Sequence, residues 1–140
     1  MRWFRRFSRP SGSSTAPNGP PSLPSERRRA PATPERLTTL TLTSFLREHP
    51  RAVVDVWAPW CGPCRAFGPV FASVAQEWGG SVGFGKVHAD HEPSLVARFG
   101  VRAIPSLLFF RNGELVRTEV GVSSADQLTK QLRKVFRDLP

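Results

Sequence analysis

Two cysteines separated by two residues, Cys61 and Cys64, are the only cysteines in the 140-residue chain. A structural zinc site usually needs four Cys or His ligands, and His49, His88 and His91 form no recognisable ligand set with this pair. A disulfide across two intervening residues closes too short a loop to constrain the unfolded chain much. The pair therefore predicts reversible thiol chemistry, and no metal site is expected.

The position of Cys61 in the sequence predicts which of the two sulfurs attacks a substrate first. It stands between an apolar run, residues 52–58, and an amphipathic stretch over residues 61–78. At the start of a helix, free amide groups and the helix dipole stabilise a thiolate, so Cys61 is expected to be the attacking sulfur. Cys64 lies one turn later and is expected to attack the resulting mixed disulfide and release the reduced substrate.

The second step needs a proton acceptor, and Asp55 is the candidate because it is the one acid in the apolar run. Period-two alternation places it on the same face as Val53 and Trp57. Burial there is expected to raise its pKa and let it accept a proton from Cys64. The alternative is an aspartate on an edge strand, exposed to solvent.

Hydrophobic periodicity predicts the strands and helices that position these residues. Strands are expected over residues 37–42, 52–58 and 82–89 and in both arms of a hairpin over 106–120. Helices are expected over residues 43–48, 61–78 and 93–99 and after a capping box formed by Ser124 and Gln127. The order βαβαβαββα predicts an α/β fold with a central mixed β-sheet and helices on both faces.

Three further local signals bear on this scaffold. Asn112-Gly113 favours a type I′ turn at the tip of the hairpin. Pro69 is expected to kink the helix over residues 61–78. Pro105 precedes a strand, and because only about 5–6% of X–Pro bonds in folded proteins are cis, pattern alone favours a trans Ile104-Pro105 bond.

The net charge of +9 is unevenly distributed along the chain. Residues 1–36 hold seven of the 14 prolines and eight arginines against two glutamates, so they predict a disordered basic extension. Residues 37–140 carry twelve basic and nine acidic residues and are expected to form one domain. No basic stripe with interleaved aromatics is seen in them, so specific nucleic-acid binding is not expected.

The composition of residues 1–36 is compatible with more than one cellular compartment. A cytoplasmic protein is the first expectation, and an organelle protein with residues 1–36 as a transit peptide is the second, because residues 1–25 are rich in Arg and Ser and lack acids. The third is weak polyanion or membrane-surface contact, since Trp3, Phe4 and Phe7 alternate with arginines. No apolar run approaches the ~20 residues of a membrane-spanning helix.

The stretch WAPWCGPC, residues 57–64, together with Asp55, Pro69, Ile104-Pro105, Asn112-Gly113 and Gly121, resembles the thioredoxin family over roughly residues 37–137. The resemblance implies the thioredoxin fold and a protein-disulfide reductase, with Cys61 as nucleophile, Cys64 as resolving thiol and Asp55 as proton acceptor. It also implies that Lys86 lies near Asp55, and that the Ile104-Pro105 bond is cis.

The same resemblance implies an apolar docking surface for substrates. Trp57, in the apolar run, is expected to be a supporting core residue. Its expected members are Trp60, Gly62, Pro63, Ala103, Ile104, Pro105, Val120, Gly121 and Val122. Disulfide-containing client proteins and a flavin- and NADPH-dependent thioredoxin reductase are the implied partners, no bound cofactor is expected, and the chain is expected to be a monomer. Ala103 stands where many members have a smaller or polar residue, which bears on substrate preference.

A protein of a different class also fits the sequence. A binding module could hold a partner on the same apolar surface without turning over its thiols. Reduction of insulin disulfides separates this alternative from a reductase, because only the reductase exceeds a variant that lacks both cysteines.

Overall fold

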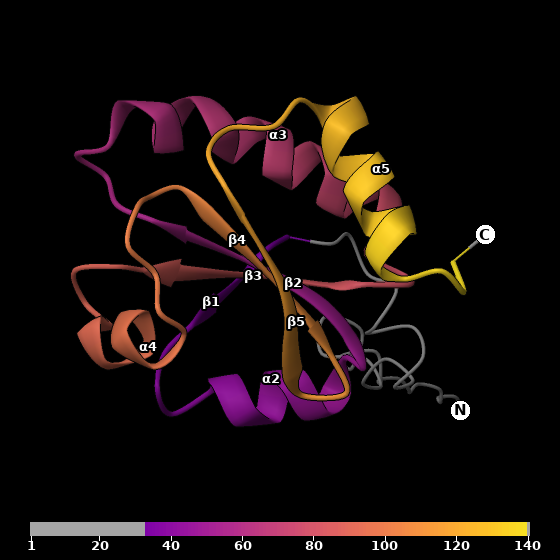
Figure 1. Ribbon diagram of the computed structural model, residues 1–140, viewed down its shortest axis with the longest axis horizontal. Coiled ribbons are helices and arrows are strands. Elements are labelled where there is room, and N and C mark those ends of the chain that lie inside the picture. The colour runs from indigo at the N-terminus through magenta and orange to yellow at the C-terminus, as the bar shows by residue number, and fades with distance from the viewer. Residues whose placement is uncertain (1–32, 140) are drawn as a thin grey trace, which may run out of the picture.

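A five-stranded mixed sheet forms the centre of the computed structural model, which describes residues 33–139 (Figure 1). The predictions made for residues 1–32 lie outside the described residues. Parallel pairing joins β1 to β3 and β3 to β2, and antiparallel pairing joins β2 to β4 and β4 to β5, giving the order β1-β3-β2-β4-β5. The strands are β1 (Glu35–Leu37), β2 (Arg51–Trp57), β3 (Gly83–His88), β4 (Ser106–Arg111) and β5 (Glu114–Val120).

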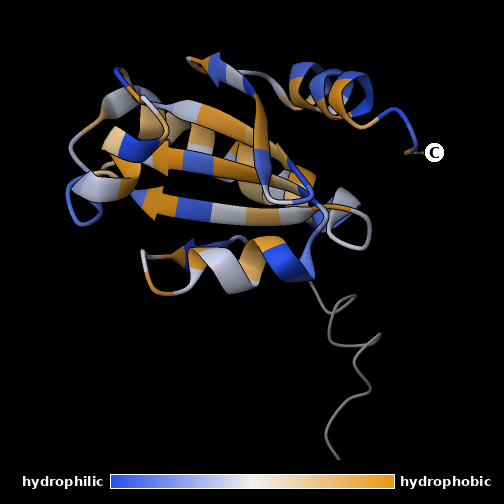
Figure 2. Cartoon of the chain, turned by 60° about the horizontal axis from the view of Figure 1, so that its bottom comes forward, coloured by the Kyte–Doolittle hydropathy of each residue, from blue (hydrophilic) through white to orange (hydrophobic). Residues whose placement is uncertain are grey.

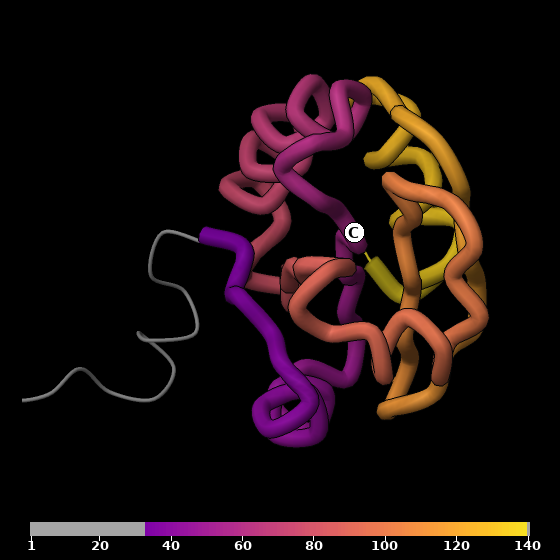
Figure 3. Tube along the Cα trace, turned by 90° about the vertical axis from the view of Figure 1, so that its left-hand side faces the viewer, coloured from indigo at the N-terminus to yellow at the C-terminus, as the bar shows by residue number. Residues whose placement is uncertain are grey.

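Helices cover both faces of this sheet, so the predicted element order and layer arrangement are confirmed. In Figure 1, α3 and α5 lie above the sheet and α2 and α4 below it, and Figure 3 shows the same layers from the end where α3 begins. The helices are α2 (Leu42–Glu48), α3 (Gly62–Trp78), α4 (Pro93–Arg98) and α5 (Ala125–Val135).

Strand alternation divides the core into two clusters. Val53 of β2 packs with Phe67 and Phe71 of α3, whereas the neighbouring Val54 packs on the other face with residues of α2 and α4. Because β2 is central and covered on both sides, it is apolar throughout apart from Arg51 and Asp55, as a doubly buried strand should be. Figure 2 shows the contrast with α5, whose hydrophobic and hydrophilic residues alternate along the helix.

Local signals set the ends of the elements. Asn112 and Gly113 both have positive φ, 50° and 85°, as the predicted type I′ turn requires. Ser124 and Gln127 form the predicted capping box at the start of α5. α3 continues through Pro69, and its first turn contains Pro63, where a missing N–H costs nothing.

The predicted strand over residues 37–42 is wrong. β1 covers Glu35–Leu37, and Leu42 already begins α2. Between them the backbone turns because the Thr38 amide donates to Oγ1 of Thr41 at 2.9 Å, a side-chain bond that competes with strand pairing. Leu40, which the alternating pattern assigned to the strand, is 89% exposed in this turn. The predicted boundary between an extension and a domain at residue 36 stays a prediction. Glu35 and Arg36, which it assigned to the extension, are paired with β3 in the sheet.

Gly83 marks a close approach between β3 and the end of α2. A Cβ at this position would lie 2.6 Å from Cβ of His49, so the backbone would have to shift. We expect Gly83→Ala to lower the free energy of unfolding by about 1–3 kcal/mol, measured by urea denaturation. Gly68→Ala is the matched control, because nothing lies within 4 Å of its added Cβ and alanine favours the helix. Equal stability of the two variants would contradict the packing argument.

Candidate active site

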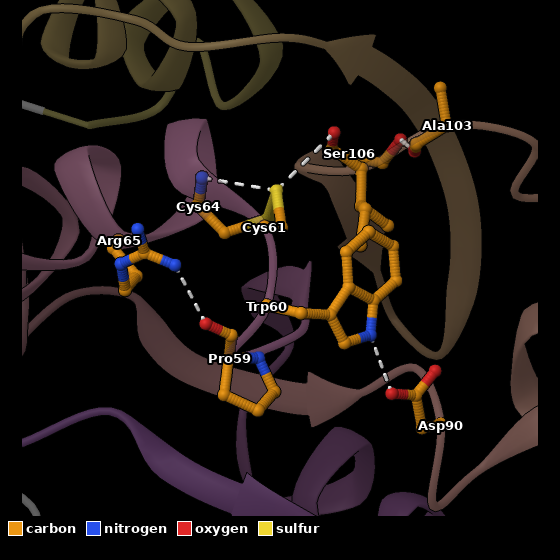
Figure 4. The surroundings of a disulfide bond; sticks show 9 residues. Pro59, Trp60, Cys61, Cys64, Arg65, Asp90, Ala103 and Ser106 are labelled. Carbon is orange, nitrogen blue, oxygen red and sulfur yellow. Dashed lines mark hydrogen bonds between the residues drawn. A yellow bond between two sulfur atoms is a disulfide. The ribbon is translucent and has the colours of Figure 1, made fainter.

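Cys61 and Cys64 form a disulfide at the N-terminal end of α3 (Figure 4). Cys61 is the N-cap residue, and its Sγ accepts a hydrogen bond from the Cys64 amide at 3.2 Å. The Cα atoms of the two cysteines are 5.2 Å apart, so the bond closes within one helical turn. An amide at the N-terminal end of α3 is therefore directed at the sulfur of Cys61, where it would favour a negative charge.

The disulfide is largely shielded, and its two sulfurs are not equivalent. Cys61 is 6% exposed and Cys64 2%, and both pack with Ala58, Trp57 and Ile104. The carbonyl oxygen of Ile104 lies 3.8 Å from Sγ of Cys61. Cys61 is therefore the more exposed of the two cysteines.

The Ile104-Pro105 peptide bond is cis, so the trans bond that pattern alone favoured is wrong, and the expectation drawn from the resemblance is correct. The bond lies in the loop that faces the disulfide, just before β4. The Pro105 carbonyl accepts a hydrogen bond from the Gly121 amide at 2.9 Å, which joins this loop to the segment after β5.

The predicted docking surface consists of Trp60, Gly62, Pro63, Ala103, Ile104, Pro105, Val120, Gly121 and Val122. Its large exposed apolar side chains are Trp60 and Val120, each 65% exposed, and Val122, 52% exposed. Val120 is paired with Ser106 in the β4–β5 ladder, next to the cis bond. Pro105 itself is buried, so within this set it supports the loop more than it contributes surface.

Asp55 is fully buried in the centre of β2, and neither carboxylate oxygen has a hydrogen-bond partner. The edge-strand alternative is wrong, because β3 and β4 flank β2 on its two sides. Alternation from Val53 turns Asp55 toward the face covered by α3, whose buried side carries Cys64 and Phe67 at adjacent turns. Asp55 therefore lies in the layer of side chains between β2 and the part of α3 that carries Cys64.

Burial raises the pKa of Asp55 from 3.8 to about 7, and the nearby Lys86 ammonium opposes the rise. Asp55 and Lys86 are Cα partners in the parallel β2–β3 ladder, which places their side chains on the same face. Nζ of Lys86 lies 4.4 Å from the centroid of the Trp57 ring. A carboxyl group with this pKa gains and loses its proton near neutral pH.

Sequence reasoning missed Asp90. Nε1 of Trp60 donates a hydrogen bond to Oδ2 of Asp90 at 2.7 Å, so the exposed indole is held on the surface instead of rotating freely (Figure 4). The available signal was that Asp90 follows β3, whose carboxyl end lies beside that of the parallel strand β2. Residues after neighbouring parallel strands meet at one edge of the sheet.

We expect Asp90→Ala to raise the KM for a protein disulfide about threefold with little change in kcat, because the indole loses a charge-assisted hydrogen bond. Asp90→Asn keeps an acceptor oxygen and should restore most of the wild-type KM. Steady-state insulin reduction measures both constants. An unchanged KM in Asp90→Ala would show that the position of Trp60 does not depend on this bond.

The described part of the chain lacks the features of two other kinds of site. Within residues 33–139, no three His, Cys, Asp or Glu side chains come together as a metal ion would require. No helix in the same range has the length and apolar character needed to cross a bilayer.

A disulfide that caps a helix above a buried acid, on a five-stranded mixed sheet covered on both faces, defines a thiol-disulfide oxidoreductase with the thioredoxin fold. The family model described as Thioredoxin matches residues 35–134. A thioredoxin of Porphyra purpurea is 42% identical over 82 residues, which is 59% of this chain and 77% of that protein. The chain therefore belongs to the thioredoxin family and is a thioredoxin-type protein-disulfide reductase with Cys61–Cys64 as its redox pair.

Solved structures agree with this assignment. The crystal structure of Malassezia sympodialis thioredoxin superposes with a TM-score of 0.68 at 30% identity, over 74% of this chain and 90% of that one. A mutant thioredoxin from Halobacterium salinarum superposes with a TM-score of 0.72 at 27% identity, over 79% of this chain and 96% of that one.

Proposed function

We propose that Cys61 is the nucleophile of the reduced protein and Cys64 the resolving thiol. The Cys61 thiolate attacks one sulfur of a client disulfide, forming a Cys61–client mixed disulfide and releasing the other client sulfur as a thiol. Cys64 then attacks Cys61, which re-forms the Cys61–Cys64 disulfide and releases the second client thiol. The observation that carries this order is the Cys64 amide directed at Cys61 Sγ, together with the greater exposure of Cys61.

We propose that Asp55 accepts the proton that Cys64 loses in the second step. Its burial, its lack of hydrogen-bond partners and its pKa of about 7 support this role. Lys86 is then a positioning residue, because its charge limits how far the pKa of Asp55 rises. Trp57 supports both by packing against the disulfide and beneath the Lys86 ammonium.

The docking surface is proposed to hold the client while the disulfides exchange. Clients are disulfide-containing proteins, and exposed apolar side chains next to Cys61 in sequence (Trp60) and next to the cis bond (Val120) support contact with a client segment. Ala103 is exposed beside the cis bond and is expected to affect which clients fit. No charged residue belongs to this surface, so recognition is expected to depend mainly on shape and apolar contact.

The oxidised pair needs an external source of two electrons. We propose an NADPH-dependent flavin thioredoxin reductase as this source, and cytoplasm as the compartment, with import into an organelle as the alternative if residues 1–36 are a transit peptide. The N-terminal mass of the protein isolated from its own cells separates the two locations. A mature chain lacking most of residues 1–36 would contradict the cytoplasmic assignment.

The test of the proposed function is turnover of insulin disulfides coupled to NADPH oxidation, with a thioredoxin reductase from the same cell. We expect NADPH oxidation only when this protein, the reductase and insulin are all present. The control is a chain with both Cys61→Ser and Cys64→Ser, which keeps the docking surface but cannot exchange electrons. Wild-type turnover no faster than this control would overturn the proposal and favour a binding module.

A further inference from the structure

β5 forms one edge of the sheet, and no strand within residues 33–139 pairs with its outer side. It is seven residues long, whereas β1, at the opposite edge, has three. Its side chains are exposed or half-buried throughout, with Val116 50% and Val120 65% exposed. A long exposed edge strand can pair with another chain unless its sequence opposes that pairing.

The backbone groups that β5 directs away from the sheet belong to Thr118 and Val120. The Gly121 amide donates to the Pro105 carbonyl at 2.9 Å, in register with the antiparallel β4–β5 ladder. In such a ladder, bonded positions alternate with positions whose N–H and C=O point to the opposite side. Between Arg117 and Gly121, which the bulge in this ladder does not reach, the odd-numbered residues therefore bond to β4. The N–H and C=O groups of Thr118 and Val120 point outward.

The pairing of β4 on its other side leads to the same assignment. The Asn112 amide donates to the Pro50 carbonyl at 2.7 Å, in register with the antiparallel β2–β4 ladder. The even-numbered residues of β4 therefore bond to β2. Leu107 and Phe109 then bond to β5, each opposite an odd-numbered residue of that strand. Two separate hydrogen bonds thus agree on which backbone groups of β5 point outward.

The charges of β5 favour one way of pairing with a second copy of the chain. Arg117 and Glu119 form an ion pair within the strand and lie on one face of it. When two copies pair antiparallel with Thr118 opposite Thr118, each Arg117 lies opposite Glu119 of the other copy, and the four charges alternate in sign. Centring the pair on Arg117 or on Glu119 would instead place like charges opposite each other, which destabilises a sheet.

The backbone favours the same register as the charges. Because Thr118 directs its N–H and C=O outward, the two copies of Thr118 can exchange both hydrogen bonds. Arg117 and Glu119 of the other copy then form a non-hydrogen-bonded pair, in which Cα atoms are about 4.5 Å apart and side chains lie closest. Val120 comes to lie opposite Val116, so two exposed valines cover each other.

We propose that β5 pairs antiparallel with β5 of a second copy, centred on Thr118, and forms a dimer with two-fold symmetry. The two sheets become one continuous sheet. The partner is a second copy because the order of charges along β5 is complementary to itself under a two-fold rotation. The monomer expected from the resemblance is then the form at low concentration.

The experiment is sedimentation equilibrium of the full oxidised chain over a range of concentrations. Cys61 and Cys64 are bonded to each other, so a disulfide between chains does not contribute. We expect a reversible dimer. Thr118→Pro removes the outward N–H but no bond to β4, and should raise the dimer Kd at least about tenfold. Thr118→Val is the matched control, since it keeps the amide, and should change the Kd less than about twofold.

Charge reversal tests the register. Arg117→Glu alone and Glu119→Arg alone should each raise the Kd at least about tenfold, although they change the net charge in opposite directions. The double variant Arg117→Glu/Glu119→Arg restores alternating signs and should dimerise within about threefold of the wild type. An equimolar mixture of the two single variants should form a mixed dimer of similar strength, because each variant supplies the charge that the other lacks. The ion pair within each chain stays broken in that mixture.

Three results would each overturn the proposal. The first is a wild type that stays monomeric up to about 1 mM. The second is dimerisation of Thr118→Pro as strong as that of Thr118→Val. The third is a mixture of the single charge variants that associates no better than either variant alone, since the charges would then act only within a chain. Circular dichroism verifies that the variants are folded, and none of these measurements depends on thiol turnover.

Discussion

Cys61→Ser is expected to lower the rate of insulin disulfide reduction by at least about a thousandfold, to the uncatalysed rate with dithiothreitol alone. A serine hydroxyl is not ionised near neutral pH, so the capping amide of Cys64 has no anion to stabilise and the first bond to the client cannot form. Turbidity of precipitating insulin chains measures this loss. Retention of more than a tenth of the wild-type rate would mean that Cys61 is not the nucleophile.

Cys64→Ser tests the same mechanism from the other side. Without the resolving thiol, the Cys61 thiolate still attacks, but the mixed disulfide persists, and intact mass spectrometry should find one client chain attached to Cys61. The reciprocal variant, Cys61→Ser, is the control and should capture little, because Cys64 is 2% exposed. Capture by the control equal to that of Cys64→Ser would reverse the assigned roles.

Asp55→Ala is expected to stabilise the oxidised protein by about 2–3 kcal/mol at pH 8, because a buried carboxylate without hydrogen bonds is costly. The folded pKa of about 7 lies above the ordinary value of 3.8, so the folded state retains the proton over this interval. The wild-type free energy of unfolding therefore decreases as pH rises from about 4 to 7, and then levels off. Near pH 4 the gain from the substitution should vanish or become a small loss, because a neutral carboxyl is tolerated and alanine leaves a gap.

Guanidinium denaturation at pH 4.5 and pH 8 measures this difference. The conservative control is Asp55→Glu, which keeps a titratable carboxyl and should keep the decrease of stability between the two pH values. Asp55→Ala should also slow release of the client from the mixed disulfide at pH 7, while alkylation of Cys61 by iodoacetamide changes little. A variant whose stability gain is the same at both pH values would contradict titration of Asp55 in the folded protein.

Local sequence patterns predicted most of the strands, helices and turns of the domain. The β-branched run of β2, the capping box of Ser124 and Gln127, and the Asn112-Gly113 turn each depend on neighbours within a few residues. Such signals survive in any tertiary context that accommodates the element, so the element order was correct. The pattern failed at residues 37–42, where Leu and Thr alternate as in a strand but the Thr41 hydroxyl turns the backbone.

Several features of the site depend on contacts that no local pattern encodes. Trp60 is hydrogen-bonded to Asp90, thirty residues later, and the Ile104-Pro105 bond is cis although most X–Pro bonds are trans. The pKa of Asp55 depends on its burial in the packed core beneath α3 and on Lys86 in the neighbouring strand.

The chain's own residues thus fixed the reacting sulfurs and their place at a helix start, because spacing and capping are local properties. Their environment was decided by the tertiary structure, because desolvation and pairing arise only when distant segments pack together. The pKa of Asp55 is the clearest case: the residue and its apolar strand are visible in the sequence, but the loss of every hydrogen-bond partner is a property of the assembled core.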